Sequence, residues 1–362
     1  MVKRTIQQLS AFYQRHEFRV DMAFFVGGFL FDVVTLSGID DALAIVQQVL
    51  YLAVIALLLG LDLLHAHGKV ALPARMEKLW EARGFIIHFM LGSLLSVYSL
   101  FFFKSASILS SVVFVGLIMA LMFANELKSV QGKGPAIKIA LFVVCLFSFF
   151  SMLIPVLLGF VGWLPFLSAI ALTLALLFLA IRWLTKRLEG PVFHILWTPS
   201  IVVLSLFFVL YLLGWVPPVP LALEEIGIYH QVERIPGGYR LKHQNPSWKF
   251  WNKGDQDFRA RAGDKVFVFT RVFAPSRFND ELALRWERYD LGSGWVTSDR
   301  IRLKVVGGRE EGHRGFAFKS NFTPGDWRVK VETSDGRELG RIALSISPDE
   351  ERGEREWVIE QR

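Results

Sequence analysis

Long apolar runs fill the first part of the chain, whereas apolar and polar residues alternate in the last part. A helix needs about 20 mainly apolar residues to cross the ~30 Å hydrocarbon core of a bilayer. Seven runs of roughly this length lie within residues 21–215, at 22–39, 42–64, 85–103, 108–126, 136–158, 161–183 and 197–215. The pattern therefore predicts a membrane domain, an all-α bundle of seven transmembrane helices.

The apolar pattern ends abruptly at a proline-rich stretch. Trp215 is followed by Val-Pro-Pro-Val-Pro, residues 216–220. Proline cannot continue a helix, and several prolines together make an extended, semi-rigid segment. The following residues mix turn signals with short apolar stretches. We therefore predict a Pro-rich spacer and linker over 216–262 that contains one or two strands.

From Gly263 onward, apolar residues recur at every second position, which is typical of half-buried strands. Six such segments lie at 265–273, 281–288, 300–306, 313–319, 327–333 and 338–345. The last two flank Ser334-Asp335-Gly336, where glycine supplies the positive φ that a tight turn needs. This spacing predicts a soluble all-β domain over 263–347, an antiparallel Ig-like sandwich, with an open barrel as the alternative. Residues 348–362 form a charged tail.

Positive charges mark one side of the predicted bundle. The segment before the first run and the loops after the second, fourth and sixth runs hold 14 lysines and arginines, and the alternate loops hold only Lys104. The 14 are Lys3, Arg4, Arg15, Arg19, Lys69, Arg75, Lys78, Arg83, Lys128, Lys133, Lys138, Arg182, Lys186 and Arg187. Because cationic loops stay in the cytoplasm, we expect a cytoplasmic N-terminus. Seven crossings of a bacterial inner membrane then place the β domain in the periplasm.

Residues 1–20 form an amphipathic lead-in to the first run. Ile6, Leu9 and Phe12 fall on one side of a helix, and Arg15 and Arg19 lie near the other. This pattern is typical of a helix at the membrane interface. Since the first apolar run begins only at Met22 and contains Asp32, we interpret the segment as a cytoplasmic lead-in rather than a cleavable signal.

Four short motifs in the predicted β domain occur together: Leu282-Ala-Leu-Arg-Trp286, Gly294-Trp-Val-Thr-Ser298, Gly325-Asp-Trp-Arg-Val329 and Asp335-Gly-Arg-Glu-Leu-Gly340. They resemble a small bacterial β-domain of unknown function that recurs in envelope proteins, sometimes behind a membrane region. The full layout resembles uncharacterised seven-span membrane proteins of Gram-negative bacteria. The resemblance implies the fold and an envelope location, and it brings no known activity or catalytic residue.

The composition and the absence of known motifs limit the functions that the sequence predicts. The formal net charge of +7 divides into +5 for residues 1–220 and +2 for the rest, and neither part has the dense basic cluster that nucleic-acid binding needs. The single cysteine, Cys145, excludes an intrachain disulfide. No phosphate-binding loop, nucleophile elbow or His-Glu-x-x-His motif occurs. We therefore expect no enzymatic activity and no cofactor.

One carboxylate lies inside a predicted span. A charged Asp32 in hydrocarbon would cost at least a few kcal/mol, so it should face protein, pair or be protonated. Gln47 and Gln48 lie at a similar depth in the second span. We expect Asp32 to hydrogen-bond one of them as a polar clasp between the two helices. A proton or ion relay is the functional alternative.

A second polar cluster lies near the predicted inner surface. Asp62 and His65 share a helix face, His67 follows, and His88 lies near the start of the next span. Carboxylates and imidazoles bind zinc and other first-row metals. Polar residues are expected at the headgroup boundary in any case, so Asp62, His65 and His88 remain weak metal candidates and we predict no metal site.

The linker contains an aromatic stretch between lysines. Trp248 and Phe250 alternate with Lys249, and Trp251 follows. Exposed aromatics could stack on sugars or lie at lipid headgroups. Burial against the β domain is the alternative, and it is favoured because large aromatics usually lie in cores.

The sequence leads to an expectation for function. We expect an integral inner-membrane protein whose periplasmic sandwich binds an envelope protein, peptidoglycan or another envelope component, with the bilayer as its other partner. A transporter or channel is one alternative, although the third to seventh spans carry almost no central charge. A sensor that signals through a partner protein is another. An intramembrane enzyme is a third.

Overall fold

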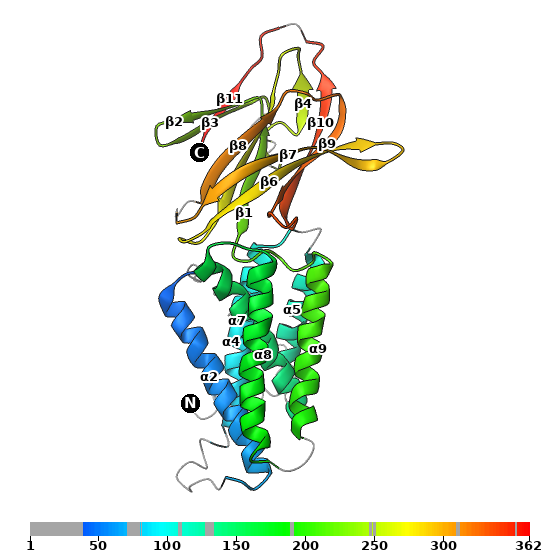
Figure 1. The fold of residues 1–362 in the computed structure, drawn as a ribbon. Helices are drawn as coiled ribbons and strands as arrows, with labels where there is room; N and C mark the ends of the chain where they lie inside the picture. The colour runs from blue at the N-terminus through cyan, green and yellow to red at the C-terminus, as the bar shows by residue number, and fades with distance from the viewer. Residues whose placement is uncertain are drawn as a thin grey trace, which may run out of the picture. The chain divides into compact units, whose positions relative to one another are not determined.

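Helices precede strands throughout the part of the chain that the structure describes (Figure 1). The computed structural model describes residues 39–70, 80, 82–107, 111–126, 134–188, 192–245, 248, 251–308, 312–351 and 353–362. The lead-in at 1–20 and the first predicted span at 22–39 lie outside these residues, apart from residue 39.

The helices fall on the other six predicted spans. They are α2 (Ala42–Ala66), α4 (Arg83–Lys104), α5 (Val112–Glu126), α7 (Pro135–Leu158), α8 (Trp163–Thr185) and α9 (Val192–Leu212). Among the described residues, five of them (all but α5) are long and apolar enough to cross a membrane. The full span at 108–126 stays a prediction: the 15 residues of α5 rise about 22 Å at 1.5 Å per residue, and residues 108–110 lie outside the described part of the chain.

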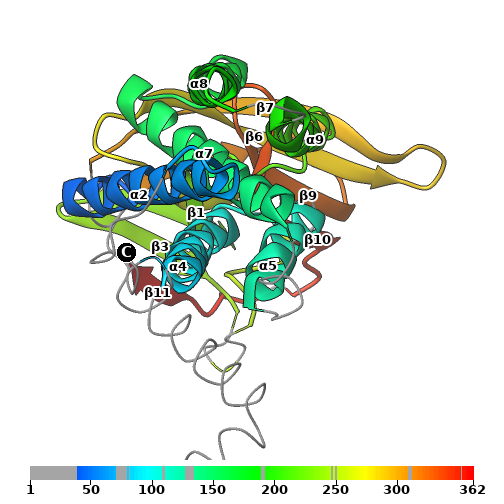
Figure 2. The ribbon, with the colours of Figure 1, turned by 90° about the horizontal axis from the view of Figure 1, so that it is seen from below.

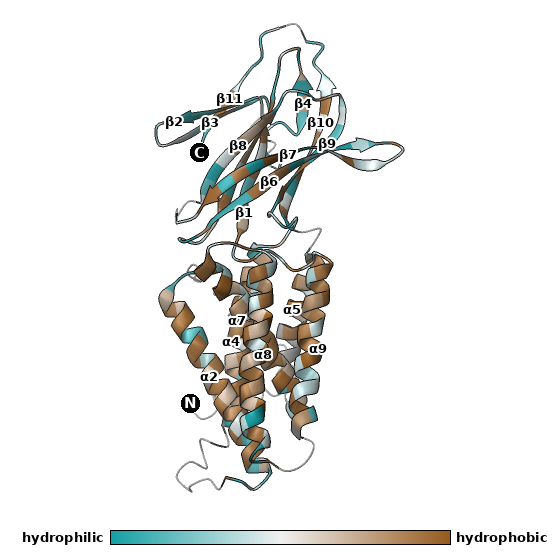
Figure 3. Ribbon diagram, viewed as in Figure 1, coloured by the Kyte–Doolittle hydropathy of each residue, from teal (hydrophilic) through white to brown (hydrophobic). Residues whose placement is uncertain are grey.

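Hydrophobic residues, coloured brown in Figure 3, occupy most of the length of these helices. Leu43, Leu57 and Leu179 are exposed, while Ile55 and Leu94 are buried. A helix that is hydrophobic all round is typical of a membrane span. At the start of α2 the Asp41 side chain accepts a hydrogen bond from the Leu43 N–H (2.9 Å), the expected N-cap. These features indicate insertion into a membrane.

The chain divides into two compact units. The second unit consists of Phe101–Gly116, Phe149–Leu176 and Leu204–Arg362. It therefore contains every described strand and one end of each of α4, α5, α7, α8 and α9. Figure 2 views these helices nearly along their axes. The remaining parts of these helices and all of α2 belong to the first unit.

Eleven strands occupy the described residues from Ala222 onward. They are β1 (Ala222–Tyr229), β2 (Gln231–Ile235), β3 (Gly238–His243), β4 (Asp257–Ala260), β5 (Val266–Phe273), β6 (Asn279–Asp290), β7 (Gly294–Val306), β8 (His313–Lys319), β9 (Gly325–Glu332), β10 (Glu338–Pro348) and β11 (Val358–Gln361). They form sheets in the orders β1-β5-β8, β4-β10-β9-β6-β7 and β11-β3-β2.

The strand pairings extend the β domain beyond the expected segments. Four strands lie within the stretch predicted as spacer and linker, where one or two were expected. β1 pairs with β5, and β4 pairs with β10 in parallel, an exception to the expected antiparallel order. In the charged tail, β11 pairs with β3.

The core of this region lies between the three-stranded β1-β5-β8 sheet and the five-stranded sheet. Trp286, Phe258 and Leu284 are fully buried there. Val161, from the connection between α7 and α8, belongs to the same cluster. The nearby Gly159 carbonyl accepts a hydrogen bond from the Asn279 N–H at the start of β6 (2.8 Å). A connection between two apolar helices thus completes the sandwich core.

Candidate functional site

The predicted polar clasp cannot be followed in full, because Asp32 lies outside the described residues. Gln47 is exposed on α2, and its amide donates a hydrogen bond to the Tyr51 hydroxyl one turn later (3.2 Å). Gln48 is half-buried on the same helix. The clasp and the relay both stay predictions.

The weak metal candidates have other partners. The Asp62 carboxylate accepts a hydrogen bond from Arg83 Nε (2.7 Å), which bridges α2 and α4. A ring nitrogen of His65 meets the Val70 carbonyl (3.2 Å), and His67 meets that of Leu63 (2.8 Å). The described residues contain no group of three or more His, Cys, Asp or Glu side chains that could hold a metal ion, and His88 joins no such group.

The aromatic stretch of the linker is exposed rather than buried where it is described. Trp248 is 63% exposed and Trp251 58%, and their rings meet edge to face at 5.7 Å. The expected burial of these two side chains is therefore wrong. Phe250 lies outside the described residues. Further along the chain, Trp286 and Trp327 are core residues and Trp295 is partly exposed.

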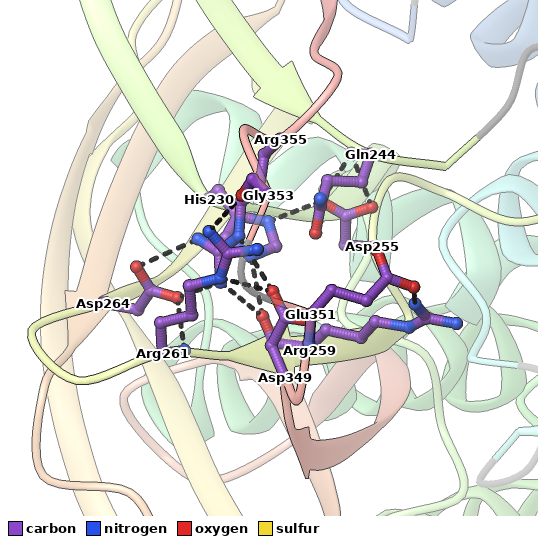
Figure 4. Close-up of polar contacts among 10 residues, drawn as sticks. All are labelled: His230, Gln244, Asp255, Arg259, Arg261, Asp264, Asp349, Glu351, Gly353 and Arg355. Carbon is purple, nitrogen blue, oxygen red and sulfur yellow. Dashed lines mark hydrogen bonds and ion pairs between the residues drawn. The ribbon is translucent and has the colours of Figure 1, made fainter.

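A buried pair joins His230, between β1 and β2, to Asp255, between β3 and β4 (Figure 4). His230 Nδ1 meets Asp255 Oδ2 at 2.7 Å, and Nε2 meets the Arg259 carbonyl at 3.2 Å. Asp255 also accepts hydrogen bonds from the N–H groups of Gln244 and Asn245. Within the described residues no serine, threonine or cysteine hydrogen-bonds this pair. It joins three segments of the sandwich.

Arg355 holds the tail against the same region (Figure 4). Its guanidinium binds both oxygens of Asp264 (2.7 and 3.1 Å) and reaches Asp349 (3.3 Å). Burial raises the pKa of Asp264, but hydrogen bonds from Arg355 and from the Arg261 N–H outweigh it and leave that pKa below its ordinary value. Paired charges and bidentate geometry of this kind are typical of a structural fastening.

The turn between β9 and β10 makes a buried polar cluster with one end of α9. Arg337 donates hydrogen bonds to Asp335 Oδ2 (2.6 and 3.1 Å) and to the Tyr211 hydroxyl. Its guanidinium also lies 3.7 Å from the centre of the Tyr211 ring. We call Tyr211, Asp335 and Arg337 the latch. All three belong to the second unit.

Burial sets the electrostatics of the latch. It lowers the pKa of Arg337 to about 9 and raises the pKa of Asp335 above its ordinary value. Both shifts oppose ionisation, so the pair depends on its mutual hydrogen bonds to remain charged. Phe166 stacks on the Tyr211 ring at 3.5 Å. Proline and aromatic side chains line a small pocket beside Arg337, among them Pro165, Pro217 and Phe102.

Apolar side chains gather at the free end of the β6–β7 hairpin. Leu291 is 97% exposed, and Tyr289, Trp295 and Val296 are also exposed. We call these four residues the tip cluster. Figures 1 and 2 both show the hairpin extending past the neighbouring strands of its sheet. Large exposed aromatic and aliphatic groups that lie together mark interaction sites.

The tip cluster is held in a defined geometry. The Tyr289 and Trp295 rings meet at 5.3 Å, and the Arg328 guanidinium lies 4.2 Å from the Trp295 ring. In the turn, Asp290 Oδ1 accepts hydrogen bonds from the Ser293 and Gly292 N–H groups, which lower the pKa of its carboxyl. Of the four sequence motifs, one contains Trp295, and none contains Tyr289 or Leu291. Alternation predicts which face a residue takes, and it does not show how far a hairpin extends.

Comparison with known families gives one match. Residues 279–346 match the family described as Protein of unknown function (DUF2914). The matched segment runs from the start of β6 into β10 and includes the tip cluster and two latch residues, Asp335 and Arg337. It confirms that the C-terminal region resembles a β-domain of unknown function. The resemblance to seven-span proteins stays a prediction.

Solved structures add only distant likenesses. An immunoglobulin-like protein from Pseudomonas aeruginosa is 12% identical, with 34% of this chain and 97% of that chain covered and a TM-score of 0.21. The alkylpurine DNA glycosylase AlkC of Pseudomonas fluorescens, bound to DNA containing an abasic site analog, is 10% identical, with 86% and 99% covered and a TM-score of 0.17. At these TM-scores neither likeness carries a fold or a function over to this chain. No curated protein matches it.

Proposed function

We propose that this chain is an integral protein of the bacterial inner membrane whose periplasmic β domain binds another envelope protein through the tip cluster. The apolar helices support the membrane location. The alternation of cationic loops along the sequence supports a cytoplasmic N-terminus and a periplasmic β domain.

The observation that carries the binding role is the tip cluster itself. Tyrosine and tryptophan are enriched among the residues that contribute most to protein–protein binding, because each offers a large, rigid contact area. Leu291 extends into solvent at the end of the hairpin. The hydrogen bonds of Asp290 fix the turn, so little conformational entropy is lost when a partner covers it. A protein surface with an apolar recess fits this shape and chemistry.

Photocrosslinking in cells tests the proposal. A photoreactive residue replaces Leu291 in the full chain, and a control chain carries it at Ile359, which is also exposed but lies on β11 in another sheet. We expect a discrete crosslinked product from position 291 and none from position 359. No product from 291, or the same products from both positions, would contradict the proposal.

A further inference from the structure

A row of four basic residues crosses the outer face of the five-stranded sheet. Arg285 lies directly opposite Arg300 on β7 and Lys330 on β9, and Lys330 lies opposite Arg341 on β10. Directly opposed residues of antiparallel strands point to the same face. Because Leu284 and Trp286 are buried on either side of Arg285, the row lies on the face away from the core.

More cations surround this row. Residues two positions along each strand share a face, which adds Arg302, Lys304 and Arg328. Over these four strands the face holds seven cations and five carboxylates, a surplus of two positive charges. The carboxylates are Glu281, Glu287, Asp326, Glu332 and Glu338. We call this surface the cationic face.

Three of the five carboxylates lie beneath the cations, and Glu281 and Asp326 are exposed. The Glu287, Glu332 and Glu338 side chains are nearly buried, whereas that of Arg302 is 82% exposed. Within the described residues, Arg300 and Lys304 have no ion-pair partner. The cations offered to solvent are therefore concentrated on β7, where Arg300, Arg302 and Lys304 follow one another on the same face.

The row of like charges lowers the stability of the five-stranded sheet. Like charges directly opposite each other on neighbouring strands destabilise a sheet. Buried glutamates offset part of this: Glu332 pairs with Arg285 (2.9 Å), and Glu287 pairs with Lys330 (3.1 Å). These pairs also fix the long side chains in place. Five of the seven cations are arginines, whose planar groups bind carboxylates with two parallel hydrogen bonds.

We propose that the cationic face binds an acidic surface of the protein partner. The inference rests on the proposed function, because the face is continuous with the tip cluster through Arg328, which packs on Trp295. Its partner offers carboxylates spaced over about 14 Å, which is the sum of the three spacings of 4.7–4.9 Å that separate four neighbouring strands. The tip cluster supplies the apolar anchor and the cationic face selects an acidic neighbour.

A binding experiment on the solubilised full chain tests the inference, with fluorescent poly-L-glutamate as the probe. The variant R300Q/R302Q/K304Q removes three exposed cations from the face. The control R234Q/K253Q/K265Q removes the same charge from exposed cations outside this sheet. We expect salt-sensitive binding that falls about tenfold in the first variant, roughly twofold for each exposed ion pair, and less than about twofold in the control.

Several outcomes would overturn the inference. Equal losses in both variants would mean that only net charge matters. Stronger binding to phosphatidylglycerol vesicles than to poly-L-glutamate, lost in the first variant alone, would assign the face to lipid headgroups. If position 291 captures a partner and R300Q/R302Q/K304Q leaves that capture unchanged, the inference fails while the proposed function stands. If position 291 captures nothing, the proposed function fails. The poly-L-glutamate experiment then still measures whether the cationic face binds an acidic ligand.

Discussion

Charged residues at the end of the chain form ion pairs with neighbours in the sandwich. Arg355 binds Asp264 and Asp349, and both carboxyl groups have a pKa below the ordinary value, because hydrogen bonds from arginine and from backbone N–H groups outweigh burial. Burial opposes the charge on Arg355, but these two partners raise its pKa. The tail therefore contributes to the stability of the folded state through charge, and this contribution depends on pH.

Asp264→Asn should destabilise the chain in a pH-dependent way. Because the folded pKa of Asp264 is lowered, its contribution is fully present above the unfolded pKa of about 3.9 and is lost as the pH falls through the lower folded value. We expect the variant to lose about 1.5 kcal/mol near neutral pH, the lower limit for hydrogen bonds to a charged group. The difference from the parent chain should disappear under strongly acidic conditions.

Urea unfolding of the solubilised chain, followed by tryptophan fluorescence across this pH range, measures the effect. Asp257→Asn is the matched control, because the Asp257 carboxylate is exposed and makes no ion pair within the described residues. A constant difference between Asp264→Asn and the parent at every pH would show that shape, and not charge, explains the loss.

At the scale of elements, the β9–β10 hairpin is fastened to helix ends at two places. The latch joins its turn to α9, and Glu338 accepts a hydrogen bond from Ser107, which follows α4 (2.6 Å). The turn is fixed internally as well, since the Arg337 N–H donates to Thr333 Oγ1 (2.9 Å). The hairpin thus links a β sheet with several helix ends of the second unit.

Tyr211→Phe tests this fastening. The change removes the hydroxyl that Arg337 and Asp335 share and leaves the ring and its stacking on Phe166 in place. A buried polar group that loses its partner costs about 1–3 kcal/mol, so we expect a loss of this size in the free energy of unfolding.

Denaturant titration of the solubilised chain measures the change, with Tyr289→Phe as the control because Tyr289 is exposed at the hairpin tip. The control should stay within about 0.5 kcal/mol of the parent. A similarly small effect of Tyr211→Phe would show that the latch does not stabilise the second unit.

The sequence predicted elements better than their connections. Apolar runs identified six described helices, and alternation identified β5 to β10, because both signals are local, whereas β11 falls in the stretch predicted as a charged tail. The residues of β1 to β4 were predicted largely as linker, because these strands are short or rich in charged residues, as in Gln231–Ile235. The latch could not be predicted, because Tyr211 and Arg337 are far apart in the chain. Taken alone, Tyr211 is typical of a membrane interface and Arg337 is typical of a turn. Exposure of Trp248 and Trp251 also depended on tertiary packing.

For the whole molecule, orientation in the membrane is the main open prediction. The charge asymmetry of the loops and the predicted odd number of crossings predict a periplasmic C-terminus. An alkaline phosphatase reporter fused after Arg362 should therefore be active, because it folds only in the periplasm. A fluorescent protein that matures only in the cytosol should stay dark at the same position. The opposite pair of results would contradict the topology and the proposed function together.

The contribution of Val161 to the sandwich core affects how the protein can be divided for experiments. A soluble fragment that starts after Trp215 would lack this side chain and the Gly159 carbonyl that meets Asn279. Its hydrophobic interior would be left with a gap, and a backbone donor would lose its acceptor. Excising the β region at the proline-rich stretch should thus yield a weakened fragment unless the short α7–α8 connection is grafted back onto it.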